Sequence, residues 1–206
     1  MTQSIHAIIF DLGNVLIGWD ARLLYKRLLP DLETVERFLE EVHFLEWNAK
    51  QDAGRSFREG VAELSSQFPH HADLIQAYDV HWEESLMPPD EQAIEIVRQL
   101  KQAGWSLFLL SNFSTEKFEL VKQKHDFLNL FDDMIISGEH KSVKPEPAIF
   151  NIALQRINRA ASECLFIDDS LPNIKTSRKM GFHAIHYQSP TQLQAELRKL
   201  SIKGIV

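Results

Sequence analysis

Six polar side chains stand at, or shortly after, the ends of short apolar runs in this 206-residue sequence. They are Asp11, Ser111, Asn112, Lys144, Asp168 and Asp169. Three carboxylates with few other ligand types favour a hard cation, above all Mg²⁺, which binds through one or two carboxylates and the phosphate oxygens of a substrate. The hydroxyl, amide and ammonium groups are suitable donors to the remaining phosphate oxygens. A carboxylate beside such a phosphate can attack it in line and form an aspartyl-phosphate.

Each of these residues also has an ordinary structural explanation. A lone aspartate after a strand is commonly a helix cap, a Ser-Asn pair is commonly part of a turn, and a lone lysine is commonly a solvated charge. The adjacent Asp168 and Asp169 are harder to explain in this way, because neighbouring acids repel each other unless a cation or a hydrogen-bond network offsets their charge. The occurrence of all six at strand ends therefore favours one functional site.

The elements that must position these side chains are predicted from hydrophobic periodicity. Five apolar runs are too short for helices and predict buried strands: Ala7–Phe10, Leu107–Leu110, Met134–Ile136, Cys164–Ile167 and Ala184–Tyr187. Helical patterns lie between them, including residues 93–100, a helix with Pro147 in its first turn and a short helix over 173–180. This alternation predicts an α/β fold with a Rossmann-like, doubly wound parallel sheet. Ligands bind at the carboxyl ends of such strands, so the six side chains should converge at one edge.

One region departs from this alternation. Between Asp20 and Leu86 only helical periodicity is found, with an apolar stripe at Leu32, Val35, Phe38, Leu39, Val42 and Leu45. Pro69 separates a third helix from a fourth, and Pro88-Pro89 ends the region. We therefore expect a small all-helical insertion over residues 19–87, after the first strand, and an α/β core made of residues 1–18 and 88–206.

Composition excludes several classes of protein. The formal net charge is -7 and the pI about 5.7, which disfavours nucleic-acid binding because phosphate neutralisation needs clustered Lys and Arg. No apolar run reaches the ~18 residues that cross a bilayer, and the segment from Met1 to His6 lacks the features of a signal peptide. A single cysteine excludes an internal disulfide and multi-cysteine metal sites. We expect a cytoplasmic enzyme or small-ligand protein without membrane or nucleic-acid partners, and the sequence leaves its oligomeric state open.

Four segments, in this order along the chain, resemble the motifs of the haloacid dehalogenase-like (HAD) hydrolase superfamily. They are Ile8–Leu16 (IIFDLGNVL), Leu109–Asn112 (LLSN), Lys144–Phe150 (KPEPAIF) and Phe166–Ser170 (FIDDS). The match covers nearly the whole chain, and the ordered set is far more specific than any single segment. The helical insertion resembles the cap of the branch in which a cap lies between the first and second motifs, and residues 19–87 are called the cap below.

The resemblance implies a Mg²⁺-dependent phosphatase that acts on a small phosphorylated metabolite. By this resemblance Asp11 is the nucleophile and a metal ligand. The backbone carbonyl of Gly13 and the carboxylate of Asp169 would complete the protein's direct contacts with the metal. Asp168 would support the metal from beside it or through a water molecule.

The resemblance also assigns the groups that would hold the phosphoryl group. Ser111 and Asn112 would bind it directly. Lys144 would pair with Asp11 and with the phosphate, offsetting charge as the transition state forms. Lys141 is close in sequence, but the Lys-Pro-Glu-Pro context favours Lys144 for this role.

The chain departs from the family pattern at Gly13. In most phosphatases of the superfamily this position is a second aspartate, which protonates the leaving alcohol and then activates water. A metal contact through the backbone carbonyl survives the change, whereas the acid–base group, whose help is worth roughly 10²–10⁴ in rate, is lost. The enzyme should therefore be slow, use another acid, or act on a good leaving group such as a sugar-1-phosphate or an acyl phosphate. The Asp-Leu-Gly-Asn-Val segment is similar to bacterial glucose-1-phosphate phosphatases of the superfamily, which agrees with the last option.

A replacement acid could come from the cap or from its hinge. The positions considered are His43, Glu46 and Lys50 with Trp47 as an apolar wall, Trp19 and Asp20 after the first motif, and the turn of Asp52, Gly54 and Arg55. An ordinary surface or packing role is the alternative for each of them. The other histidines, including His70 and His71, show no spacing typical of metal ligands.

Other functions on the same fold stay open. A metal-independent 2-haloacid dehalogenase uses the same nucleophile but has no use for a cluster of cation-binding acids, so Asp168 and Asp169 favour the phosphatase. A non-catalytic binding protein is favoured only by Gly13, because the other site residues are all present. A sugar-phosphate mutase would also use Asp11, although its family normally keeps the second aspartate.

Overall fold

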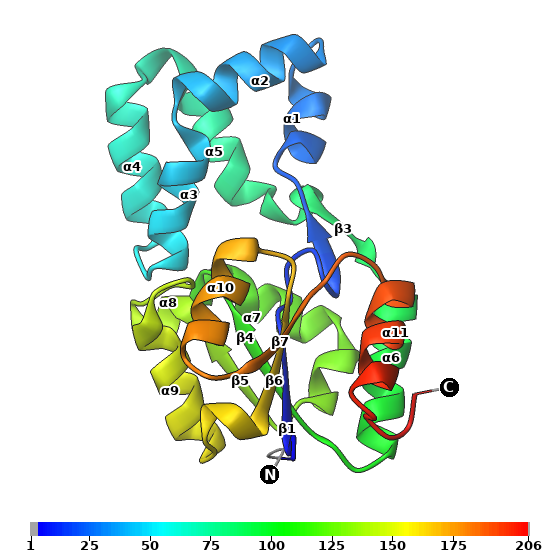
Figure 1. Cartoon of the computed structure of the whole chain (residues 1–206). Helices are drawn as coiled ribbons and strands as arrows, with labels where there is room; N and C mark the ends of the chain where they lie inside the picture. Colours follow the sequence, from blue (N-terminus) through cyan, green and yellow to red (C-terminus); the bar gives the residue numbers. More distant parts are fainter. Residues whose placement is uncertain (1–3, 206) are drawn as a thin grey trace.

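The structure, a computed structural model, describes residues 4–205 and contains a five-stranded parallel sheet that helices cover on both faces (Figure 1). The strands are β1 (Ala7–Phe10), β4 (Ser106–Ser111), β5 (Asp133–Ile136), β6 (Cys164–Asp168) and β7 (His183–His186). They lie in the order β5-β4-β1-β6-β7, so the chain winds outward from β1 in both directions. The predicted α/β fold with a doubly wound parallel sheet is confirmed.

All five predicted strands are present, and β1 has the predicted bounds. β4, β5 and β6 are longer than predicted, and β7 is shifted by one residue. The residues added to β4 and β6 include Ser111 and Asp168, which pair with Ile136 and His186 on the neighbouring strands. Apolar runs do not detect these polar strand ends, whereas backbone pairing includes them. Two of the candidate site residues are therefore parts of the sheet itself.

Alternate residues of the strands face two separate layers of helices. One layer contains α6 (Glu91–Gln102), α7 (Thr115–Lys124) and α11 (Pro190–Lys199), and the other contains α9 (Pro147–Ile157) and α10 (Leu171–Lys179). Ile8 and Phe10 of β1 pack in the first layer, and Ala7 and Ile9 pack in the second. Since all four are buried, β1 is a rigid support for the residues that follow it.

Five helices of the cap lie above the carboxyl ends of the strands (Figure 1). They are α1 (Arg22–Leu28), α2 (Leu32–Glu41), α3 (Phe44–Asp52), α4 (Phe57–Gln67) and α5 (Ala72–Val80). Aromatic rings fill the space between them: the ring centroids of Tyr25 and Phe38, and those of Phe44 and Tyr78, are 4.8 Å apart. Such pairs add to the apolar burial, so the cap has an aromatic core of its own.

The apolar stripe predicted in the cap is only partly buried. Three of its residues lie in the core: Val35, Phe38 and Val42. Leu32 and Leu45, at the two ends of the stripe, are 50% and 69% exposed. α2 ends at Glu41, and His43 has the left-handed φ of 48° that turns the chain into α3. The expectation of one buried stripe is wrong at its ends: Leu32 is the exposed first residue of α2, and Leu45 belongs to α3 beyond the turn at His43.

A second sheet, of two antiparallel strands, joins the core to the cap. β2 (Ile17–Trp19) pairs with β3 (Leu86–Pro89), where the sequence predicted no strand. Pro88 and Pro89 indicated a break, but a short edge strand tolerates proline because its outward N–H groups need no partner. The division into residues 1–18 with 88–206 and residues 19–87 stays a prediction, and its junctions fall inside this small sheet.

None of the helices described within residues 4–205 combines the length and the apolar character needed to cross a membrane. The cytoplasmic location and the absence of nucleic-acid partners stay predictions. The remaining regular elements are the short helix α8 (Ser137–His140) and four 3₁₀ turns, Pro69–His71, Trp82–Ser85, Asp126–Leu130 and Ala161–Glu163.

Candidate active site

Asp11 directly follows the central strand β1, at the edge of the sheet that faces the cap. Its backbone N–H donates to the carbonyl oxygen of Ile167 on β6 at 2.9 Å, so the strand pairing fixes its position. The N–H of Leu12 donates to Oδ1 of Asp11 at 2.7 Å, and Nζ of Lys144 lies 2.9 Å from the same oxygen. Because both contacts fall on Oδ1, Oδ2 is the oxygen with fewer protein contacts and the one that can attack a phosphorus atom.

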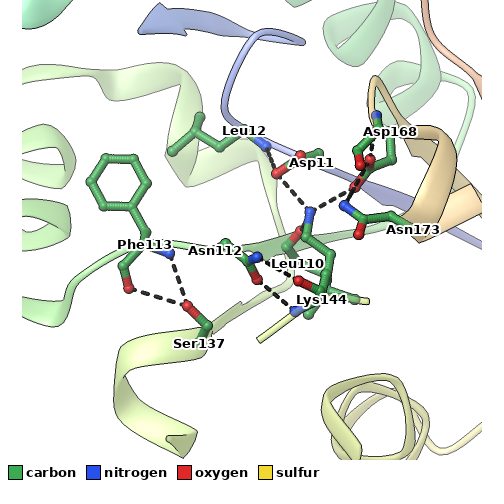
Figure 2. Close-up of polar contacts among 10 residues, drawn as sticks. Asp11, Leu12, Leu110, Asn112, Phe113, Ser137, Lys144, Asp168 and Asn173 are labelled. Atoms are coloured by element: carbon green, nitrogen blue, oxygen red, sulfur yellow. Dashed lines mark hydrogen bonds and ion pairs between the residues drawn. The ribbon is translucent and has the colours of Figure 1, made fainter. Parts of the chain in front are cut away.

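Lys144 reaches into the centre of the site from the loop between α8 and α9 (Figure 2). Its ammonium lies 2.9 Å from Oδ1 of Asp11 and 2.7 Å from Oδ2 of Asp168, and donates to the carbonyl of Leu110 at 2.8 Å. Burial by itself lowers the pKa of Lys144, but the two carboxylates together raise it above the ordinary value. The side chain is therefore a buried, fully paired cation.

The side chain of Asn112 is occupied by Lys144 rather than free for a ligand (Figure 2). Its Oδ1 accepts from the backbone N–H of Lys144 at 2.7 Å, and its Nδ2 donates to the carbonyl of Lys144 at 2.8 Å. This pair of bonds holds the lysine backbone in place. The second amide hydrogen of Nδ2 remains available to a phosphoryl group. Positioning Lys144 is therefore a larger part of the role of Asn112 than the sequence indicated.

Asp168 is fully buried at the end of β6, where its oxygens are surrounded by donors. It accepts from the N–H of Ser170 at 2.8 Å, from Nδ2 of Asn173 at 3.0 Å and from the ammonium of Lys144. These bonds use its oxygens to hold Lys144 and the start of α10. The arrangement suits a supporting role better than direct contact with a metal ion.

Asp169 is the half-buried member of the acidic pair. Its pKa is raised above the ordinary value, first by burial and then by the charge of Asp168. Burial also raises the pKa of Asp11 to about 7, even though the ammonium of Lys144 opposes the shift. Both acids thus lie where additional positive charge would stabilise their ionised forms.

The donor set fits a hard divalent cation. Carboxylate oxygens of Asp11, Asp168 and Asp169 all lie within 4.8 Å of one another. Mg²⁺ prefers oxygen ligands and keeps several water molecules. With Asp168 committed to its hydrogen bonds, the residues that would hold the ion are Asp11 and Asp169, with the backbone carbonyl of Gly13 beside them on the wall of the same cavity.

A cavity of about 360 Å³ lies over these residues, and residues of the cap form part of its wall. Ser111, buried at the end of β4, lines it together with Asp11 and Gly13. A Cβ atom added to Gly13 would meet no heavy atom within 4 Å, so the missing side chain of the family pattern leaves open space here. The six residues predicted from the sequence are thus gathered around one site.

Of the cap positions considered for a replacement acid, Trp19 and Asp52 line this cavity. The other side chains do not line it. His43 and Glu46 border a separate hollow on the cap, and the indole N–H of Trp47 donates to the Gly60 carbonyl. The charged ones form ion pairs elsewhere: Lys50 and Arg55 with Glu63, and Asp20 with Arg22. These side chains have the ordinary packing or surface roles that were the alternative for each.

Sequence reasoning missed three contacts of the cap and the site. Asn173, which holds Asp168, lies in the first turn of α10 and could have been found only as a polar residue after the acidic pair. Lys117 of α7 lines the cavity and donates to both the carbonyl and the carboxylate of Asp79 on α5, with no signal in the sequence. Glu41 brings His70 and His71 together into an exposed cluster that their spacing did not indicate.

Known hydrolases are similar to this chain in sequence. The model of the haloacid dehalogenase-like hydrolase family matches residues 5–181, so the chain belongs to this family of hydrolases. It is 24% identical over 200 residues to the sesquiterpene phosphatase astK of Aspergillus oryzae, covering 97% of this chain and 98% of that protein. It is 23% identical over 203 residues to the D-ribitol-5-phosphate phosphatase of Bacteroides thetaiotaomicron, covering 92% and 95%.

Solved structures show the same fold. The HAD family enzyme bt-2542 from Bacteroides thetaiotaomicron, in a complex with magnesium and inorganic phosphate, has a TM-score of 0.68 and 21% identity, covering 90% of this chain and 95% of that chain. Dehalogenase structures share the fold as well. The fold therefore does not choose between a phosphatase and a dehalogenase, and the choice depends on the site.

If Asp169 is a metal ligand, Mg²⁺ should stabilise the folded protein by binding it in preference to the unfolded chain. We expect millimolar Mg²⁺ to raise the Tm of the wild-type protein and to leave the Tm of Asp169→Asn unchanged, measured by scanning calorimetry. Asp126→Asn, which changes an exposed acid far from the site, is the matched control and should keep the wild-type response. An equal gain in all three proteins would place the ion elsewhere.

Removing the ammonium of Lys144 should strongly destabilise the fold, because Asp11 and Asp168 would be left buried without their cation. We expect Lys144→Met to lower the free energy of unfolding by about 3–5 kcal/mol in urea titrations. The exposed Lys141, three residues earlier, is the matched control, and Lys141→Met should change it by less than about 0.5 kcal/mol. Similar losses for the two variants would contradict the central role of Lys144.

Proposed function

We propose that this hydrolase is a Mg²⁺-dependent phosphatase that cleaves a small phosphomonoester through an aspartyl-phosphate on Asp11. The observation that carries the proposal is the balance of buried charge. Asp11 and Asp168 share the single ammonium of Lys144, and Asp169 lies beside them without a basic partner in the described part of the chain. Three acids and one ammonium leave an excess of negative charge, which a divalent cation would neutralise.

The chain's own residues supply the rest of the chemistry. Oδ2 of Asp11 attacks phosphorus, the P–O bond to the leaving group breaks, and the phosphoryl group is held on the aspartate until water releases it. Ser111 donates its hydroxyl to a phosphoryl oxygen, and Lys144 holds the ionised nucleophile in place and offsets charge in the transition state. Bound Mg²⁺ would supply charge neutralisation and orient the phosphate. Catalysis is then mainly positioning and electrostatics.

The cavity favours a small substrate, such as a sugar phosphate. Its volume of about 360 Å³ is at the small end of ligand sites. Trp19 and Trp82 supply flat apolar walls, while Asn48 and Asp52 supply groups that can bind hydroxyls. The names of the relatives astK and D-ribitol-5-phosphate phosphatase both support a phosphatase, and the second of them supports a polyol or sugar phosphate. A sugar-1-phosphate, the case with a good leaving group, is one member of it.

The alternatives account for fewer of the observed contacts. A metal-independent 2-haloacid dehalogenase would leave Asp169 and its neighbours with uncompensated charge in a half-buried position. A non-catalytic binding protein would need neither the ammonium at 2.9 Å from Asp11 nor the Asn112 bonds that hold it. Both alternatives are addressed by one assay.

We expect phosphate release from a panel of phosphomonoesters in the presence of Mg²⁺, and loss of that release in EDTA. Asp11→Asn, which removes the attacking oxygen, should abolish turnover while Asp126→Asn keeps it, measured as inorganic phosphate. The same proteins should release no chloride from 2-chloropropionate. Chloride release that persists in EDTA would establish the dehalogenase instead, and turnover by Asp11→Asn would exclude Asp11 as the nucleophile.

A further inference from the structure

The proposed phosphatase lacks a proton donor in its first motif. Gly13 stands where the family pattern has an acid, and nothing fills the space that its side chain would occupy. An alkoxide is a poor leaving group, so a phosphatase without a donor depends on activated esters. The inference below rests on the proposed function and concerns which group of this chain supplies that proton.

Asp52 is the carboxyl group of the cap that shares the cavity with Asp11. It is the last residue of α3, and Nδ2 of Asn48, one turn earlier, donates to its Oδ2 at 3.3 Å. No cation pairs with it in the described part of the chain, since Lys117, which also lines the cavity, is bound to Asp79. Asp52 is thus a carboxyl group without a counter-ion in the cavity of the nucleophile.

The backbone of Asp52 is fastened to the loop that carries the phosphate-binding residues. Oγ of Ser137 donates to the carbonyl of Asp52 at 2.6 Å and accepts from the N–H of Phe113 at 2.9 Å. Phe113 directly follows Ser111 and Asn112 in the sequence, and Figure 2 shows Ser137 beside the backbone of Phe113. One hydroxyl therefore bridges the cap to this loop.

The turn after Asp52 can lie this close only because of Gly54. A Cβ atom at Gly54 would stand 2.8 Å from the carbonyl oxygen of Gly138 in α8, and the φ of 97° is strained for any other residue. The close approach of Gly54 to Gly138 and the Ser137 hydrogen bond both join the end of α3 to α8. Together they hold the end of α3 against the core, with Asp52 over the cavity.

The surroundings of Asp52 favour its neutral form. Burial raises its pKa to about 7 from an ordinary value of 3.8, against a smaller lowering by the backbone N–H of Ser114. Its place at the carboxyl end of α3 disfavours negative charge in the same direction. Tyr78 on α5 is close enough to interact with its charge. The titratable groups that line the same cavity from other elements are Lys117, Asp11, Lys144 and Asp169, while Lys141 lies beside Gly54, two residues later.

We infer that Asp52 is the general acid and base of the reaction, replacing from the cap the residue that is absent at Gly13. Protonated Asp52 gives its proton to the leaving oxygen as the P–O bond to that oxygen breaks and the Oδ2–P bond to Asp11 forms. The resulting carboxylate then takes a proton from water as the water oxygen bonds to phosphorus and the Asp11–P bond breaks. Asp52 ends protonated and Asp11 ends as a carboxylate, so atoms and charges balance over the cycle.

The test compares two esters of similar size whose leaving groups differ in basicity. With p-nitrophenyl phosphate the leaving group needs no proton, whereas with 2-phenylethyl phosphate it does. We expect Asp52→Asn to lower the single-turnover rate for 2-phenylethyl phosphate by about 10²- to 10⁴-fold more than it lowers the rate of p-nitrophenol release. Hydrolysis of the aspartyl-phosphate should slow in the variant with either ester, which appears as a burst of p-nitrophenol.

Gly13→Asp, for which the structure has room, provides the matched rescue. In the Asp52→Asn background it should restore a large part of the rate with 2-phenylethyl phosphate. Equal losses with the two esters, or a change in KM alone, would show that Asp52 only binds substrate and would overturn the inference. A wild-type protein that releases no phosphate from either ester would instead overturn the proposed function.

The pH dependence of the wild-type protein gives a readout that needs no variant. The ratio of the 2-phenylethyl to the p-nitrophenyl rate should fall as the pH rises through about 7, because Asp52 then loses the proton that it donates. In Asp52→Asn the ratio should be low and independent of pH. A wild-type ratio that does not change with pH would contradict the assignment.

The pH dependence of the protein's stability should also report the protonation of Asp52. As the pH rises from about 4 to 7, the unfolded chain loses this proton while the folded chain keeps it, so the folded state becomes less favoured. The Tm of Asp52→Asn should therefore rise relative to that of the wild-type protein over this range. A difference in Tm that stays constant with pH would show that Asp52 is already ionised and would count against its role as the acid.

Discussion

The ammonium of Lys144, held between Asp11 and Asp168, is the interaction on which the rest of the site depends. Removing an ammonium and two carboxylates from water costs several kcal/mol for each ion, and their attraction offsets this only where the geometry and the added hydrogen bonds are good. Here the third N–H of Lys144 finds the carbonyl of Leu110, and Asn173 donates to Asp168. The partners come from β1, β4 and β6, which lie side by side in the sheet, so the strand order itself assembles the network.

This network also underlies the two proposals made above, a bound metal ion and an acid that comes from the cap. The single ammonium is shared by two acids, and the proposed Mg²⁺ would balance the charge of Asp169. The position at Gly13 is left open, and Asp52 is the carboxyl group that the cap places over the same cavity. In the proposed mechanism, proton transfer depends on the cap being seated on the core, through the Ser137 bridge and the close approach of Gly54 to Gly138.

The sequence predicted the sheet well, because each buried strand must be apolar on both faces. It placed the strand ends less well, since Ser111 and Asp168 pair as strand residues while being polar. It missed β3 because two prolines normally end a strand, and it joined α2 to α3 in one stripe because periodicity does not show the turn at His43. Each difference arises where backbone pairing or a left-handed residue, rather than side-chain hydrophobicity, decides the local structure.

The sequence by itself determined the class of fold, the family resemblance and which six polar residues lie together, because strand ends in a parallel sheet meet at one edge whatever the details of packing. It could not decide what each polar group contacts. Three findings follow from contacts between residues far apart in the chain. Asn112 holds the backbone of Lys144, donors enclose Asp168, and Asp52 rather than His43 lines the cavity. Such contacts depend on how the cap packs on the core, and only the tertiary structure specifies that packing.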